Sequence, residues 1–224
     1  MPLPAAILKA ARERPELLYT IVVAGMYLVG IVSHLWPPTR PVMAGLTPGF
    51  LLATGVAALL LAIPVERRAT HLVWVGLAYL VTFALEALGV ATGMIFGAYR
   101  YGTVLGAHLL GVPPVIGFNW VMVVLAFIGL FSRLPHGRFW GPVLTAAAAT
   151  GFDWIMEPVA IGLGYWSWDQ GTIPLQNYAA WFAIALVASA SHSLLGLRWR
   201  RATPAILVGA QLVFFGVLRV ALFR

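Results

Sequence analysis

Two carboxylic acids stand four residues apart in a segment that is otherwise apolar enough to cross a membrane. These are Asp153 and Glu157, within residues 151–182. On a helix this spacing places both side chains on one face, one turn apart. A charged acid in hydrocarbon costs roughly 3 kcal/mol or more, so such residues usually face a partner or a cavity. We interpret one residue of the pair as a general acid and the other as a group that holds the water or balances the cation. The alternative is a hydrogen-bonded pair that tightens helix packing.

Further polar and aromatic residues are predicted to reach the same end of the membrane. Glu86 lies at a similar depth on another apolar run and is the third predicted catalytic acid. The aromatic faces of residues 165–168 can stabilise a cation, although an interfacial aromatic belt is the competing interpretation. We predict these substrate-binding residues: Tyr99, Tyr101, Asn119, Trp120, Tyr165, Trp166, Trp168, Gln176 and Asn177.

Two details of the acid segment carry separate predictions. Pro158 has no backbone N–H, so the carbonyl of Trp154 loses its helical partner and a polar notch should lie beside the acids. Arg219 has two open roles, pairing with an acid or extending to the membrane interface, and we favour the second.

The composition is typical of an integral membrane protein and not of a soluble one. Of its 224 residues, 61% are hydrophobic and 9% are charged, and the mean hydropathy is +0.91. Soluble domains carry about 25% charged residues. The net charge of +7 is dispersed at the ends of apolar runs, which argues for membrane topology and against nucleic acid as a partner. We predict a single integral membrane domain over residues 1–224.

The predicted fold is an all-α, polytopic membrane bundle of about seven transmembrane helices. Each apolar run has about the 20 residues needed to cross a hydrocarbon core of roughly 30 Å. Residues 91–112 are too long and apolar for a simple turn, and we predict a partly re-entrant or interfacial segment there. The predicted spans are Leu17–Trp36, Leu46–Pro64, His71–Val90, Pro113–Phe131, Phe139–Gly162, Pro174–Gly196 and Pro204–Phe223.

The basic residues predict the orientation in the cell membrane. Ten of the 14 Lys and Arg residues lie at the amino terminus or in the connections that share its side. The other four are Arg40, Arg100, Arg219 and Arg224. Because cytoplasmic loops carry the excess of positive charge, we expect a cytoplasmic amino terminus and an extracytoplasmic carboxyl terminus. The predicted acid cluster then lies in the outer half of the membrane.

Some chemistries are disfavoured by residue type. The chain has no cysteine, which excludes disulfides and thiolate metal sites. No two of the five histidines have helical ligand spacing, so we predict no metal site. The only lysine, Lys9, precedes the first span, which excludes a retinal photoreceptor with a Schiff-base lysine in a span.

Four motifs together resemble the carotenoid biosynthesis membrane-protein family, which includes carotenoid 1′,2′-hydratases and bisanhydrobacterioruberin hydratases. They are EALGVATGMIFGAYRYG (86–102), GVPPVIGFNW (111–120), FDWIMEPVAIGLGYWSW (152–168) and IPLQNYAAW (173–181). The resemblance covers roughly residues 80–182. The DQGT loop at 169–172 is shorter than the family pattern, so the exact substrate is left open.

The resemblance implies addition of water to the terminal C1–C2 double bond of an acyclic carotenoid, by protonation and water capture, without a cofactor. The substrate would enter from the lipid phase, and association with other carotenoid-biosynthesis enzymes is a further expectation. A proton-coupled transporter or a non-catalytic carotenoid- or lipid-binding protein is the alternative. A transporter should line both halves of the membrane with polar groups, whereas the polar groups here gather in one half.

Overall fold

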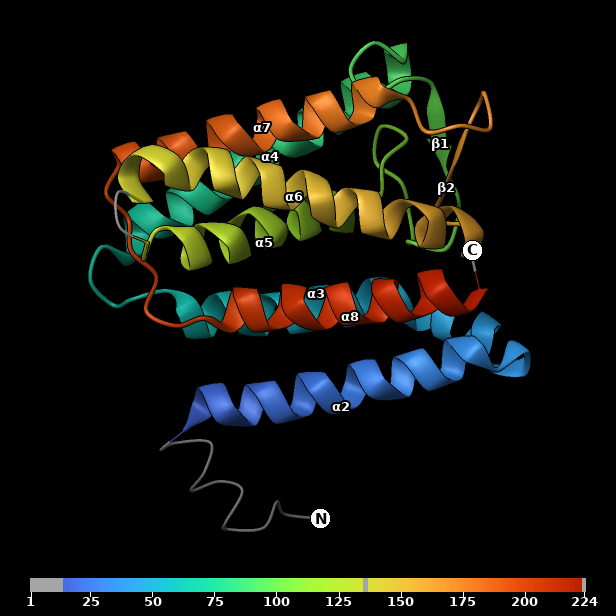
Figure 1. Ribbon diagram of the computed structural model, residues 1–224, viewed down its shortest axis with the longest axis horizontal. Helices are drawn as coiled ribbons and strands as arrows, with labels where there is room; N and C mark the ends of the chain where they lie inside the picture. Colours follow the sequence, from blue (N-terminus) through green and yellow to red (C-terminus); the bar gives the residue numbers. More distant parts are fainter. Residues whose placement is uncertain (1–13, 135–136, 223–224) are drawn as a thin grey trace.

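Seven α-helices run along one common direction in the part of the chain that the computed structural model describes, residues 14–134 and 137–222 (Figure 1). A single 3₁₀ turn, η1 (Pro37–Thr39), joins the first two of them. The helices are α2 (Pro15–Leu35), α3 (Arg40–Ala62), α4 (Arg68–Thr92), α5 (Pro114–Phe131), α6 (Gly137–Gly162), α7 (Leu175–Leu194) and α8 (Thr203–Leu222).

Five of the described helices are long and apolar enough to cross a membrane: α2, α3 with η1, α4, α5 and α8. The other two, α6 and α7, have 26 and 20 residues. They are less apolar, because α6 holds Asp153 and Glu157 and α7 begins with Gln176 and Asn177. The prediction of an all-α membrane bundle is confirmed.

The core of the bundle lies around α5. This helix packs against α3, α4, α6, α7 and α8, and its residues from Trp120 to Ala126 are all buried. A helix that is apolar on every side is typical of such a central position. The first helix, α2, lies at the edge of the bundle, where it contacts α8 and α3 (Figure 1).

One end of the bundle carries a cap, which we define as residues 93–113 and 163–174. It contains β1 (Tyr99–Tyr101) and β2 (Trp166–Trp168), which pair antiparallel. Residues 91–112, predicted to be partly re-entrant or interfacial, lie at this end (Figure 1). The sequence interpretation contained no strand, so the two-stranded sheet corrects it. Three-residue strands are too short to show a periodic hydrophobic pattern.

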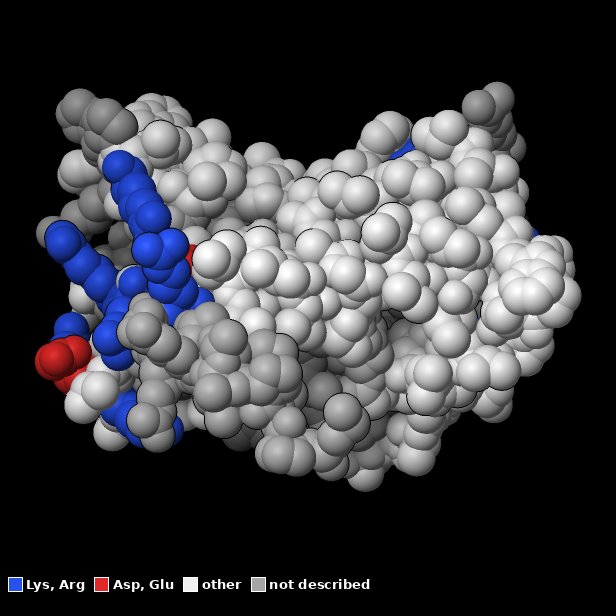
Figure 2. All heavy atoms as spheres, turned by 90° about the horizontal axis from the view of Figure 1, so that it is seen from below, with Lys and Arg blue, Asp and Glu red and all other residues white. Residues whose placement is uncertain are grey.

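Basic side chains gather at the end opposite the cap (Figure 2). Those described there are Arg14, Arg67, Arg68, Arg133, Arg198, Arg200 and Arg201. The cap end carries Arg40, Arg100 and Arg219. Lys9, Arg12, Arg224 and the side chain of Arg138 lie outside the described part. The described charges therefore divide between the two ends as the sequence predicted.

Candidate active site

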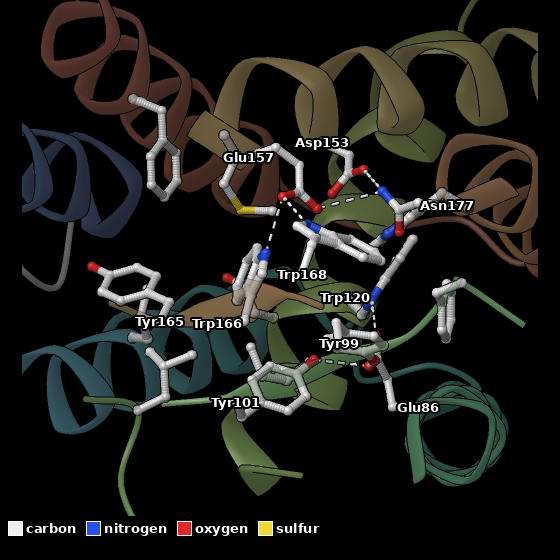
Figure 3. Close-up of a pocket in the computed structure, with 18 of the residues that line it drawn as sticks. Glu86, Tyr99, Tyr101, Trp120, Asp153, Glu157, Tyr165, Trp166, Trp168 and Asn177 are labelled. Carbon is white, nitrogen blue, oxygen red and sulfur yellow. Dashed lines mark hydrogen bonds between the residues drawn. The ribbon is translucent and has the colours of Figure 1, made fainter. Parts of the chain in front are cut away.

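A small cavity beneath the cap is lined by all three predicted catalytic carboxylates (Figure 3). Its volume is about 60 Å³. Glu86 reaches it from α4, and Asp153 and Glu157 reach it from α6; their exposed fractions are 4%, 1% and 2%. Burial of a carboxylate is costly unless hydrogen-bond donors compensate it. The donors therefore show how each acid is held.

Glu86 accepts hydrogen bonds from three aromatic side chains. Its Oε2 accepts from the hydroxyl of Tyr99 and, at 2.8 Å, from that of Tyr101. Its Oε1 accepts from the indole Nε1 of Trp120 on α5, at 3.1 Å. Both oxygens of this buried acid are thus satisfied by protein donors.

Glu157 is held in a similar way by a different set of donors. Its Oε2 accepts from the indole Nε1 atoms of Trp166 at 3.0 Å and Trp168 at 3.1 Å. Its Oε1 lies 3.4 Å from the amide Nδ2 of Asn177 on α7. Hydrogen bonds to an ionised acceptor are among the stronger ones, so three donors favour the anionic form of this side chain.

The pairing of β1 with β2 delivers four of these aromatic donors at once. Tyr99 stands opposite Trp168, and Tyr101 stands opposite Trp166. Their ring centroids lie 5.0 Å and 5.9 Å apart. Because side chains alternate between the two faces of a strand, the intervening Arg100 points away from the cavity. It forms a 2.5 Å salt bridge with Asp169 on the exposed side.

A glycine permits the close approach of the two cap segments. The N–H of Gly102 donates to the carbonyl of Tyr165 at 2.8 Å. A Cβ at position 102 would collide with the carbonyl oxygen of Gly164. Gly102 is therefore required for the ladder that carries the tyrosines and tryptophans to the acids.

The cap tyrosines remain hydrogen-bond donors. Burial, and after it the charge of Glu86, raises the pKa of Tyr99 and of Tyr101 above the ordinary value. Burial likewise raises the pKa of Tyr165 to about 12. These phenols are protonated at neutral pH, so the two that contact Glu86 carry the hydrogens that they donate to it.

Asp153 differs from the two glutamates. Its Oδ2 accepts from Asn177 Nδ2 at 2.8 Å. Its Oδ1 is buried and has no hydrogen-bond partner among the described residues. Asn177 thus connects Asp153 to Glu157 with one amide nitrogen, and one oxygen of Asp153, a residue that lines the cavity, is left without a donor.

Residues 46–223 match the family described as carotenoid biosynthesis protein, which is well over half of the chain. The chain belongs to this family. It is 34% identical over 135 residues to bisanhydrobacterioruberin hydratase from Haloarcula japonica. That match covers 55% of this chain and 44% of the relative, so the chain spans less than half the length of the curated relative it matches. No solved structure matches significantly. The resemblance inferred from the four motifs is confirmed.

The remaining predicted binding residues of this carotenoid-family protein divide into two groups. Asn119 and Tyr165 line the cavity together with the aromatic and amide donors described above. Asn119 Oδ1 accepts from Gln211 Nε2 at 3.0 Å. Gln176 does not line the cavity; it is exposed, and its amide donates to the carbonyl of Met94. Gln176 thus forms a contact between α7 and the cap, and its role in substrate binding stays a prediction.

Several residues that line the cavity were missing from the sequence interpretation. Trp181 stacks on Trp120, and Phe96, Met156 and Phe215 add apolar surface. Gln211 of α8 is 1% exposed. A lone amide in the middle of an apolar span is the signal that could have identified it, because such residues usually face the interior of a bundle.

The notch beside Pro158 is filled by the arginine whose role the sequence left open. Arg219 Nη1 donates to the carbonyl oxygen of Trp154 at 2.6 Å. Its guanidinium carbon also lies 4.0 Å from the centroid of the Trp154 ring. The side chain thus binds a backbone carbonyl and an aromatic face, instead of extending to the interface alone. This contact joins α8 to α6 one turn before Pro158.

Among residues 14–134 and 137–222, no three His, Asp or Glu side chains are arranged to hold a metal ion. The three carboxylates of the site instead take their donors from indole, phenol and amide groups. The absence of a metal or other cofactor stays a prediction.

Proposed function

We propose that the protein is a carotenoid hydratase, which adds water across the terminal C1–C2 double bond of an acyclic carotenoid to give a tertiary alcohol. The observation that carries this proposal is the convergence of three buried carboxylates and several aromatic rings on one cavity. Membership of the carotenoid biosynthesis family limits the substrate class. The relative from Haloarcula japonica is named as a hydratase, which supports the reaction type.

Asp153 is the proposed general acid. Its Oδ1 lacks a donor, whereas Glu157 and Glu86 each receive three. An oxygen without a donor is where a proton can be carried and given up. Transfer of that proton to C2 breaks the π bond and leaves a tertiary cation at C1. Water then forms the C1–O bond, and its surplus proton returns to Asp153, so that the net change is the addition of one water.

Glu157 and the aromatic rings are the proposed stabilisers of the cation. Glu157 accepts hydrogen bonds from two indoles and an amide, which stabilise its ionised form, and a negative charge there would favour a transition state in which positive charge develops. The faces of nearby aromatic rings add to this effect. A cavity of about 60 Å³ has room for only a few water molecules, which limits the number of nucleophiles near the cation.

The test is the pigment profile of a host that makes the acyclic carotenoid lycopene, with and without this protein. We expect a new, more polar carotenoid whose mass exceeds that of lycopene by one or two waters. Unchanged lycopene in the presence of well-expressed protein would contradict the proposal. A non-catalytic binding protein would retain lycopene without converting it, and a transporter would do neither.

We further propose that the cap faces the extracytoplasmic side of the cell membrane, because the described arginines crowd the other end. A reporter fused after Arg224 should then behave as extracytoplasmic, and one inserted between Arg67 and Arg68 as cytoplasmic. The opposite result for both fusions would reverse the orientation. Association with other carotenoid-biosynthesis enzymes is also proposed, since the substrate and product would stay in the same membrane.

A further inference from the structure

A second and larger cavity forms a groove on the side of the bundle, between α2 and α3. Its volume is about 490 Å³. The α2 wall includes Ile21 and Val29, each 61% exposed, and Phe214 of α8 lines it as well. Among the residues that the structure describes, no Asp, Glu, Lys or Arg lines it. The groove is thus an apolar space that opens toward the lipid.

The groove and the acid cavity meet. Four residues line both of them: Leu51, Tyr165, Gln211 and Phe215. In the close-up, Tyr165 lies at the edge of the site, away from Glu86 and Asn177 (Figure 3). The two cavities are therefore adjacent, and these side chains lie between them.

The acid cavity alone is too small for its proposed substrate. Pockets for small organic ligands usually measure about 300–1,000 Å³, and this cavity measures about 60 Å³. The groove falls within that range. Its α2 wall extends from Ile21 to His34, which is about 20 Å along a helix. This length is about two thirds of a hydrocarbon core of roughly 30 Å, so the groove fits a long, thin, apolar ligand.

We propose that this groove binds the polyene chain of the acyclic carotenoid and that the chain end passes between Tyr165 and Gln211 to Asp153. The inference rests on the proposed function for the identity of the ligand. It adds a binding site on α2, α3 and α8, three helices that contain none of the four motifs that carry the family resemblance. Lateral opening of the groove lets the ligand enter from the lipid without crossing water.

Gly25 offers a way to close the groove without disturbing the acids. A Cβ at this position would meet no heavy atom within 4 Å, and the residue lines the groove. A leucine side chain there would extend into the space proposed for the polyene. Gly76 of α4 is a matched control, because a Cβ there also meets nothing within 4 Å and the residue lines none of the cavities described above.

The experiment measures retention of lycopene by the purified full-length protein in detergent, by its visible absorption after washing. Gly25→Leu should lower the affinity by about 10- to 200-fold, the range for an added group in a tight apolar pocket. Gly76→Leu should bind as the parent does. Equal binding by the parent and Gly25→Leu would overturn the proposal. In another outcome, Gly25→Leu loses a phospholipid that co-purifies with the parent but binds lycopene unchanged. This result would assign the groove to lipid and would also overturn the proposal.

This readout is independent of turnover, so it separates the groove from the reaction. If lycopene binding depends on Gly25 but no hydrated product forms, the groove proposal stands and the hydratase proposal fails. If hydrated product forms, and Gly25→Leu binds and converts lycopene as the parent does, only the groove proposal fails. A short acyclic monoterpene with the same end group sharpens the result, since Gly25→Leu should convert it as well as the parent does.

Discussion

The two ends of the bundle bury similar side chains for different purposes. At the cap end, indole, phenol and amide donors converge on three carboxylates. At the opposite end a second polar cluster, which we call the histidine cluster, is formed by His71, Trp74, Ser191, His192 and Trp199. A polar cavity of about 720 Å³ lies beside it; its lining includes Arg133, Arg198 and Arg201 and, within the described part of the chain, no acid.

The histidine cluster uses its polar atoms to hold the chain together. The two ring nitrogens of His71 lie 2.9 Å and 3.1 Å from the carbonyl oxygens of Arg67 and Arg198. The indole of Trp199 donates to His192 Nε2 at 2.8 Å. These bonds join the loops that precede α4 and α8. The difference teaches how to interpret a buried aromatic side chain by its hydrogen-bond partner. An acid, as at the cap end, indicates chemistry, whereas a serine, a histidine or a backbone carbonyl, as in the histidine cluster, indicates structure.

The largest expected effect is on the acids of the cap end. Asp153→Asn should lower the formation of hydrated carotenoid by about 10²- to 10⁴-fold, the usual contribution of a general acid. Glu157→Gln should also lower product formation strongly, because it removes the charge opposite the cation. Glu86→Gln should lower product formation less. Protein levels should hold, because an amide is easier to bury than a carboxylate. The measurement is product per unit of membrane protein.

The matched control for the acids is Glu16→Gln. Glu16 belongs to the opposite end, where its Oε1 accepts from the N–H of Ala202 at 3.1 Å. This variant should keep the parent rate. If the variants of Asp153, Glu157 and Glu86 kept it as well, the three buried acids would be structural like the histidine cluster, and the distinction between the ends would fail.

An intermediate effect is expected from the indole donors. Trp166→Phe and Trp168→Phe keep an aromatic face but remove an N–H bond to Glu157. Hydrogen bonds to charged groups contribute about 1.5–3 kcal/mol, so turnover should fall roughly tenfold to a hundredfold. Leucine should be worse, because it loses the ring too. Trp199→Phe, which removes a donor from the histidine cluster, should leave turnover unchanged; parent-like rates in all three would show that the bonds to Glu157 are dispensable.

The smallest effect on turnover is expected at His71. His71→Leu removes contacts with two carbonyls and should cost about 1–3 kcal/mol of stability. The midpoint of thermal unfolding in detergent should drop, while the rate per folded molecule stays at the parent value. A lower rate with an unchanged midpoint would place the histidine cluster in the reaction instead.

The helices and the acids could be predicted from sequence because hydropathy and one-turn spacing are local properties. Hydropathy predicted the seven spans, and the spacing of four residues predicted that Asp153 and Glu157 share one helix face. The donors to these acids could not be assigned, because β1 and β2 are three residues each and pair across 67 positions of sequence. The Tyr-x-Tyr and Trp-x-Trp alternation was the available signal, since residues two apart share a strand face.

Gln176 and Asn177 show a second limit. Both are amides at the start of α7, and no sequence pattern distinguishes one from the other. Adjacent residues on a helix of 3.6 residues per turn point in directions about 100° apart, so only one of the two could face the acids. The structure places Asn177 at 2% exposure between Asp153 and Glu157 and leaves Gln176 exposed. Which of them turns inward depends on how α7 packs against α6, a tertiary property.

The most direct test of the central claim is the origin of the atoms added to the product. Purified protein supplied with lycopene in water enriched in oxygen-18 and deuterium should give an alcohol in which each new hydroxyl carries oxygen-18 and each hydrated end group carries one deuterium bound to C2. Asp153→Asn should give almost none of it. Product that takes its oxygen from dissolved oxygen gas, or that carries no deuterium at C2, would contradict acid-catalysed hydration at this site.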